Sequence, residues 1–122
     1  MNMNVMKFEK YGTHIGIVKS RKVLIQNEHD FVDFLTQAMQ EADANNIILE
    51  KTALSDDFFD PNTGLADVIN KRLINYRARL AIVGDFKQYE DEEFLKLIQQ
   101  NNEAGDLSFL RSVNEAVTFF AG

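Results

Sequence analysis

Hydrophobic residues follow a strand-like pattern in the first part of the chain. Apolar and polar side chains alternate over residues 5–10, and residues 14–18 are mostly apolar, which predicts two strands joined by a turn at residues 11–13. Residues 47–49, 80–83 and 107–110 are short apolar runs, and residues 23–25 form one further extended run. Continuous apolar strands need cover on both faces, or a place at the centre of a sheet.

Helices are predicted between these strands, where apolar residues recur with the period of a helix. The clearest apolar face contains Phe31, Phe34, Leu35, Ala38, Met39 and Ala42. Asn27 is placed to cap the start of this helix, and Asn45 with Asn46 to end it. The other helical faces contain Leu65, Val68, Ile69, Leu73 and Tyr76, then Phe94, Leu97 and Ile98, and finally Val113, Ala116, Val117 and Phe120. Ser112 and Glu115 form a capping box at the start of the last helix.

This alternation of strands and helices favours right-handed parallel crossovers. The 122 residues suffice for one domain with a real core. We therefore predict a single α/β domain over residues 1–122. Its mixed sheet would have about five strands, with the N-terminal hairpin at one edge, and about four helices would pack mainly on one face.

Composition narrows the class of function. Thirteen basic and nineteen acidic residues give a net charge of −6, which disfavours nucleic acid as a partner. The best local basic patch is Lys71, Arg72, Arg77 and Arg79, and acidic residues lie on both sides of it. Without cysteine there is no disulfide or thiolate metal site, which suits a reducing compartment. We find no membrane span, secretion signal, Walker phosphate loop or dinucleotide fingerprint, so we expect no membrane partner and no cofactor.

The only proline, Pro61, stands just before the apolar helical pattern that begins at Leu65. Asp60 is a good N-cap residue and Pro61 fits the first helical position, which would put Thr63 in the first turn and Gly64 just inside the helix. Glycine there costs about 1 kcal/mol relative to alanine. We therefore expect either close packing of the helix start or access for an anion or a phosphorylated Thr63 to free N–H groups. A plain solvated cap is the alternative.

The segment "FFDPNTGLADVI", followed by "RLAIVGD", resembles the STAS domain of anti-sigma-factor antagonists. Those domains carry an Asp-Ser-Ser/Thr-Gly-Leu motif between a buried strand and a helix. The resemblance equates Asp60, Thr63, Gly64 and Leu65 with that motif, and implies that Thr63 is a phospho-acceptor. This chain has one more residue between Asp60 and Gly64 than the usual motif.

A second resemblance covers nearly the whole chain. The longer segment "FFDPNTGLADVINKRLINYRARLAIVGDF", with the final "DLSFLRSVNEAV", is similar to the bacterial family called domain of unknown function 4180. This resemblance implies a small cytoplasmic bacterial protein. It brings no activity, cofactor or catalytic residue.

Charged residues follow the ends of the predicted parallel strands, where open α/β sheets usually bind ligands. Glu50 and Lys51 follow one strand and Asp85 follows another, so we predict a pocket rim formed by these residues with Asp60 and Thr63. The alternative is that these side chains are simply solvated loop residues.

Four aromatic residues leave further questions open. Phe58 and Phe59 belong either to the core or to a partner surface. Tyr76 is expected in the core, and Phe119 lies off the apolar helical face and could contact another subunit.

Three functions follow from these patterns. The first is a non-catalytic regulatory or interaction module that binds a protein partner or a small anion at residues 60–65. The second is a small enzyme with Asp60 or Asp85 as acid or base. The third is a subunit that forms a homodimer through Phe119. The scarcity of catalytic signatures favours the first, because neither His14 nor His29 has the partners of a triad in the sequence.

Overall fold

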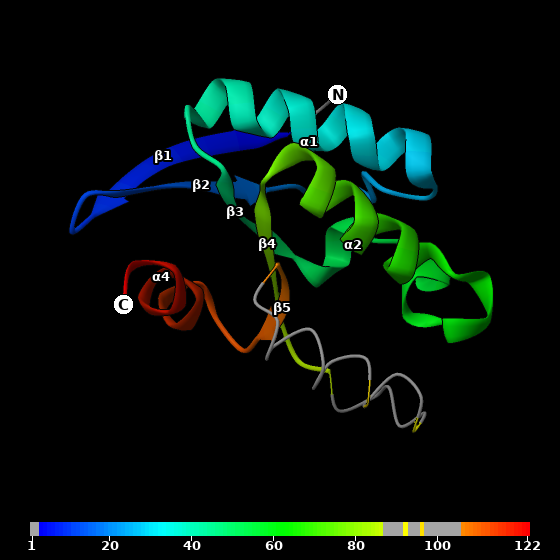
Figure 1. Cartoon of the computed structure of the whole chain (residues 1–122). Helices are drawn as coiled ribbons and strands as arrows, with labels where there is room; N and C mark the ends of the chain where they lie inside the picture. Colours follow the sequence, from blue (N-terminus) through cyan, green and yellow to red (C-terminus); the bar gives the residue numbers. More distant parts are fainter. Residues whose placement is uncertain (1–2, 87–91, 93–95, 97–105) are drawn as a thin grey trace.

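A five-stranded mixed sheet forms the centre of the molecule. The computed structural model describes residues 3–86, 92, 96 and 106–122. The strands are β1 (Asn4–Lys10), β2 (Thr13–Lys19), β3 (Asn46–Glu50), β4 (Arg79–Val83) and β5 (Leu107–Leu110). They lie side by side in chain order, with β1 antiparallel to β2 and all later neighbours parallel (Figure 1). The predicted sheet, edged by its N-terminal hairpin, is confirmed.

The hairpin turn consists of Tyr11 and Gly12, whose φ angles are 53° and 81°. Two consecutive positive φ values give the two-residue turn whose twist matches that of the flanking strands. The turn fixes the register, so that Phe8 lies opposite Ile15 and Met6 lies opposite Ile17.

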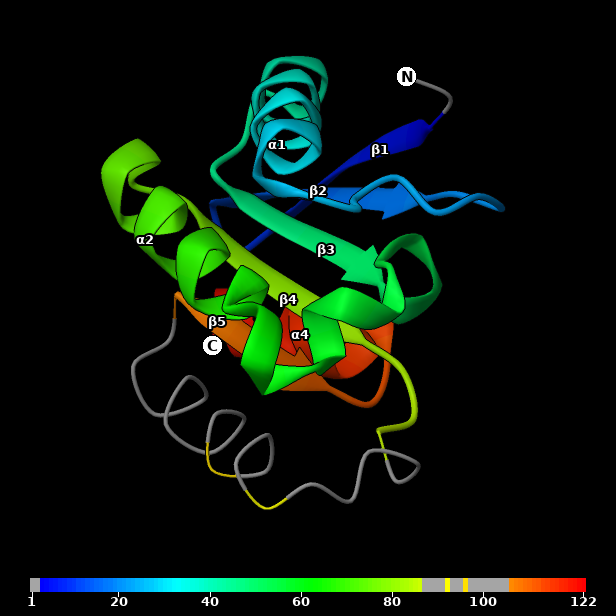
Figure 2. The ribbon, with the colours of Figure 1, turned by 90° about the vertical axis from the view of Figure 1, so that its right-hand side faces the viewer.

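Three α-helices lie in the described part of the chain, and they cover both faces of the sheet. They are α1 (Glu28–Ala42), α2 (Leu65–Tyr76) and α4 (Val113–Ala121). Figures 1 and 2 show α1 and α2 on one face and α4 on the opposite face. The helix predicted around Phe94, Leu97 and Ile98 lies outside the described residues.

The alternation of strand side chains explains this two-sided arrangement. In β3, Ile47 and Leu49 pack under α1 and α2, whereas Ile48 packs under α4. A parallel strand with both faces covered needs apolar side chains on both faces, and residues 47–49 of β3 and 80–83 of β4 have them. The apolar residues that α4 contributes are Ala116, Val117 and Phe120.

Helix caps agree with the sequence at both predicted sites. The Asn27 side chain accepts a hydrogen bond from the Asp30 N–H at 2.9 Å, and the Ser112 hydroxyl accepts one from the Glu115 N–H at 3.2 Å. The end of α1 differs from the prediction. The helix stops at Ala42 because Asp43 adopts a left-handed conformation with φ of 50°, and Asn46 already belongs to β3.

The extended run at residues 23–25 lies beside the sheet, and Ile25 makes an isolated bridge to Leu54. One other expectation needs correction. Tyr76 is 36% exposed and therefore lies outside the core, because α2 ends there and buries Leu65, Ala66, Ile69 and Leu73 instead. None of the helices in the described part of the chain combines the length and the hydrophobicity that a membrane span requires.

Candidate functional site

The connection between β3 and α2 is a series of three short 3-10 turns, η1 (Lys51–Ala53), η2 (Asp56–Phe59) and η3 (Pro61–Thr63). We call residues 56–64 the acidic loop, because Asp56, Asp57 and Asp60 are all exposed there. Such a loop needs local hydrogen bonds and side-chain anchors to hold one shape.

Two adjacent phenylalanines anchor the acidic loop. Phe58 and Phe59 are 1% and 6% exposed, which confirms their place in the core rather than on a surface. Their rings meet edge to face with centroids 5.0 Å apart. The Phe58 ring also lies 6.0 Å from that of Phe109 in β5, and the Phe59 ring 6.2 Å from that of Phe86. The loop is therefore fixed to the sheet through its aromatic pair.

The start of α2 differs from the prediction. Gly64 is the N-cap of the helix with φ of 71°, so α2 begins at Leu65 and not at Pro61. The predicted penalty for a glycine inside the helix does not arise, because Gly64 supplies the left-handed conformation that other residues adopt at a cost. Asp60 caps the small turn η3 instead, since its carboxylate accepts a hydrogen bond from the Asn62 N–H at 3.0 Å.

The Thr63 hydroxyl sits at the junction between the loop and the helix. Thr63 is exposed, yet its Oγ1 lies 2.5 Å from the backbone oxygen of Asp57 and 2.9 Å from that of Asp60, to which it donates. The same oxygen accepts a hydrogen bond from the Leu65 N–H at 3.3 Å. The hydroxyl thus joins η2, η3 and the first turn of α2.

The electrostatic character of this region is negative. Asp67 in the first turn of α2 adds a fourth carboxylate to those of the acidic loop, and its partner is Lys71 at 3.4 Å. Arg72 belongs to the predicted basic patch but pairs with Glu28 of α1 at 2.7 Å. Within the described residues, no group of three or more histidine and carboxylate side chains could hold a metal ion.

A second feature lies at the carboxyl ends of β3, β4 and β5. A hollow of about 290 Å³ is lined there by Glu50, Lys51, Thr52, Val83, Gly84, Arg111, Ser112 and Val113. Of the five predicted rim residues, Glu50 and Lys51, which are adjacent in the chain, line this hollow. Asp60, Thr63 and Asp85 do not line this hollow.

Lys51 links the hollow to the residues that follow β4. Its Nζ donates to the backbone oxygen of Asp85 and lies 5.9 Å from the centre of the Phe86 ring. The aliphatic part of Lys51 crosses Gly84, where a Cβ atom would meet the lysine Cγ and Cδ at 2.8 Å. Gly84 also has φ of 154°, so a glycine is needed there on both counts. The Asp85 side chain itself is exposed.

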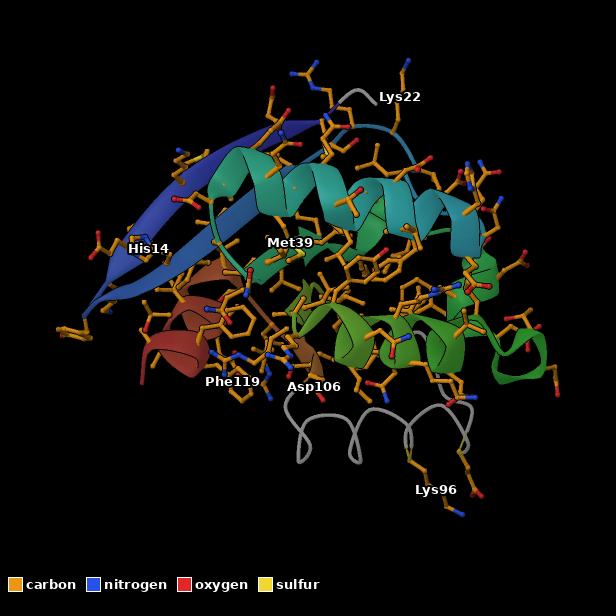
Figure 3. All side chains as sticks on the ribbon, turned by 45° about the horizontal axis from the view of Figure 1, so that its top comes forward. His14, Lys22, Met39, Lys96, Asp106 and Phe119 are labelled. Carbon is orange, nitrogen blue, oxygen red and sulfur yellow. The ribbon has the colours of Figure 1, made fainter. Side chains whose placement is uncertain are left out.

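Two arginines of the predicted basic patch have structural roles, and the two histidines and Phe119 lie elsewhere. Arg77 takes a left-handed conformation at the end of α2, and Arg79 donates to Asn46 Oδ1 at 2.8 Å while lying 4.9 Å from the Phe120 ring centre. The exposed His29 pairs with Asp33 at 3.3 Å. His14 lies near the hairpin turn and Phe119 on the surface of α4 (Figure 3). Phe119 is 36% exposed.

Both the acidic loop and the hollow lie in a segment of the chain that matches a known protein family. Residues 10–119 match the family model described as Domain of unknown function (DUF4180). The chain belongs to this family. No curated protein and no solved structure matches it. The DUF4180 segment contains the acidic loop and the whole hollow, so both are parts of the family domain, whose description carries no activity.

Sequence reasoning missed two contacts in these features. The Asp57 backbone oxygen was not expected to hold Thr63, because the two residues are six positions apart and no cap or turn pattern joins them. The crossing of Lys51 over Gly84 was missed as well. The only signal for it was a glycine directly after an apolar strand.

Proposed function

We propose that this protein is a non-catalytic regulatory module that binds a protein partner through the acidic loop. The observation that carries the proposal is the combination of exposed carboxylates on Asp56, Asp57 and Asp60 with the buried ring pair of Phe58 and Phe59. A loop held in one conformation loses little conformational entropy when it binds, which favours affinity.

The charge of the loop selects the class of partner. Asp57 and Asp60 lie in the turns just before α2, and Asp67 lies in its first turn, where an anion would otherwise find free N–H groups. The Thr63 hydroxyl also engages the Leu65 N–H. A basic protein surface is therefore favoured over a small anionic ligand, because opposite potentials attract and speed association.

Phosphorylation of Thr63 would regulate this surface. A phosphate ester has no hydroxyl proton, so the bonds from Thr63 to the Asp57 and Asp60 backbone oxygens would be lost. The phosphate would bring a charge of about −2 beside three carboxylates, which repels it from the loop's present position. The resemblance to STAS domains supports this role for Thr63. The resemblance to the DUF4180 family supports a bacterial, cytoplasmic protein as the setting of this regulation.

Capture of proteins from a bacterial lysate tests the regulatory proposal. Wild type is compared with Thr63→Glu, which adds charge and removes the donor, and with Thr63→Ser, which keeps the hydroxyl. We expect wild type and Thr63→Ser to retain the same proteins, and Thr63→Glu to lose them. Identical sets for all three, or no captured protein, would count against a regulatory Thr63.

The hollow at the strand ends supports a second candidate, a small enzyme with an acid or base. It lies where open α/β sheets usually bind ligands, and it combines Glu50 with Lys51 and Arg111. Among the carboxylates first considered, Asp60 and Asp85 lie outside its lining, so Glu50 is the better placed group. An activity screen of wild type, Glu50→Gln and Asp85→Asn separates these roles. Loss with Glu50→Gln alone would favour the hollow, and no activity in wild type would remove this candidate.

A further inference from the structure

Strand β1 is an exposed edge of the described sheet, and it carries apolar side chains. It pairs with β2 on one side only. Met6 is 51% exposed and Phe8 41% exposed. They lie opposite Ile17 and Ile15, so both face the α4 side of the sheet, at an edge that α4 leaves uncovered. The adjoining turn residue Tyr11 is 86% exposed. An edge strand of seven residues with apolar side chains is a template for another strand.

Two of the three charged residues of β1, Lys7 and Glu9, can pair with their opposites in a second copy, and the third is Lys10. Lys7 and Glu9 flank Phe8 on the opposite face of the strand, and neither forms an ion pair with another described residue. Charges of one sign on an edge strand make two copies repel each other, which guards against edge-to-edge pairing. Opposite charges placed evenly about one residue instead attract an antiparallel copy of the same strand.

We propose that two copies of this chain form a symmetric dimer by antiparallel pairing of β1 with β1, centred on Phe8. In this register Phe8 lies opposite the partner's Phe8. Lys7 lies opposite the partner's Glu9, and by symmetry Glu9 lies opposite the partner's Lys7. Met6 lies opposite the partner's Lys10, and the two sheets join into one.

The backbone of β1 is suited to this register. Lys10 and Thr13 close the two-residue turn, and such a pair exchanges hydrogen bonds across the strands. Hydrogen-bonded and non-bonded pairs alternate along an antiparallel ladder, so Lys7 and Glu9 direct their N–H and C=O groups away from β2. The proposed register places these two residues opposite each other as a hydrogen-bonded pair.

The neighbouring registers are less favourable. Two neighbouring registers also pair the backbone N–H and C=O groups that point away from β2. One of them brings Lys7 opposite the partner's Lys7, and the other brings Glu9 opposite the partner's Glu9. Like charges directly opposite each other on adjacent strands are destabilising. Only the register centred on Phe8 pairs both charges with their opposites and both aromatic rings with each other.

Sedimentation equilibrium over a concentration series, with circular dichroism to confirm folding, tests the dimer through charge reversal. We expect wild type to form a dimer. Lys7→Glu and Glu9→Lys each place like charges at both contacts and should raise the dissociation constant about tenfold or more. The double variant Lys7→Glu/Glu9→Lys should restore the dimer. An equal mixture of the two single variants should form a heterodimer, because each supplies the charge that the other lacks.

Asp56→Lys is the matched control for Glu9→Lys, since it makes the same change of charge outside β1, and it should leave the dimer intact. A monomeric wild type would overturn the proposal. So would a dimer that charge reversal at Lys7 and Glu9 leaves unchanged, because the copies would then meet elsewhere, for example through Phe119. Asp56 belongs to the acidic loop, so an intact dimer in Asp56→Lys would also show that dimer formation does not depend on the proposed binding surface.

Discussion

The Thr63 hydroxyl donates a hydrogen bond to the backbone oxygen of Asp57, with 2.5 Å between the two oxygens. This bond joins the beginning and the end of the acidic loop, and the same hydroxyl contacts the first N–H group of α2. One exposed side chain therefore helps the buried aromatic pair to hold the shape of the surface that we propose as the binding site. Any change that removes its proton alters the loop and the helix start together.

Thr63→Val should loosen the loop while leaving the rest of the fold intact. It removes one donor and one acceptor, and we expect a loss of about 0.5–1.5 kcal/mol in the free energy of unfolding. Amide hydrogen exchange at Leu65, whose N–H donates to the hydroxyl, should accelerate at the same time. Urea unfolding and exchange measured by NMR report the two effects. Thr63→Ser is the control, and equal behaviour of the two variants would show that the hydroxyl does not fix the loop.

Gly16→Ala should destabilise the contact between α1 and β2. A Cβ atom on Gly16 would lie 2.6 Å from the Cβ of Ala42 and 2.9 Å from the Cδ1 of Ile47, far inside van der Waals contact. Overpacking of this kind costs about 1–3 kcal/mol, measured by urea unfolding. The double variant Gly16→Ala/Ala42→Gly opens space for the new methyl group. It should lose less stability than the sum of the two single variants, and strict additivity would contradict the close approach.

Phe58→Ala should cost far more stability than Phe119→Ala. Phe58 is 1% exposed and its ring contacts those of Phe59 and Phe109. Its truncation leaves a cavity and should cost about 3–5 kcal/mol in the free energy of unfolding. Phe119 is 36% exposed, and a surface truncation changes stability by about 0.5 kcal/mol. Thermal unfolding of the two variants compares them directly. Similar losses would mean that the aromatic pair does not anchor the acidic loop.

The sequence predicted the sheet well because its strands are short apolar runs bounded by turns. Leu107–Leu110 was placed without error, and the caps at Asn27 and Ser112 follow from local hydrogen bonding alone. The position of α4 could not be predicted in the same way. Its apolar stripe of Ala116, Val117 and Phe120 would fit either face, and the choice depends on Ile48 and other residues distant in the sequence.

The candidate site was predicted less completely, for two physical reasons. Asp60 and Pro61 form a good local start for a helix, but Gly64 adopts a left-handed conformation that resets the start to Leu65. The pocket rim was predicted on the assumption that all residues following neighbouring strands lie close together in space. The three turns of the connection instead separate Asp60 and Thr63 from the hollow that contains Glu50 and Lys51.

The most direct measurement of the central claim compares protein capture by two triple variants of equal charge change. Asp56→Asn/Asp57→Asn/Asp60→Asn neutralises the acidic loop, and Asp60→Asn keeps the oxygen that caps η3. Asp33→Asn/Glu41→Gln/Asp43→Asn neutralises three exposed carboxylates in and beside α1. Quantified by mass spectrometry of a bacterial lysate, the loop variant should retain roughly tenfold less partner than wild type, equivalent to about 1.4 kcal/mol of binding free energy. The α1 variant should match wild type, and equal retention by all three proteins would contradict a binding role for the acidic loop.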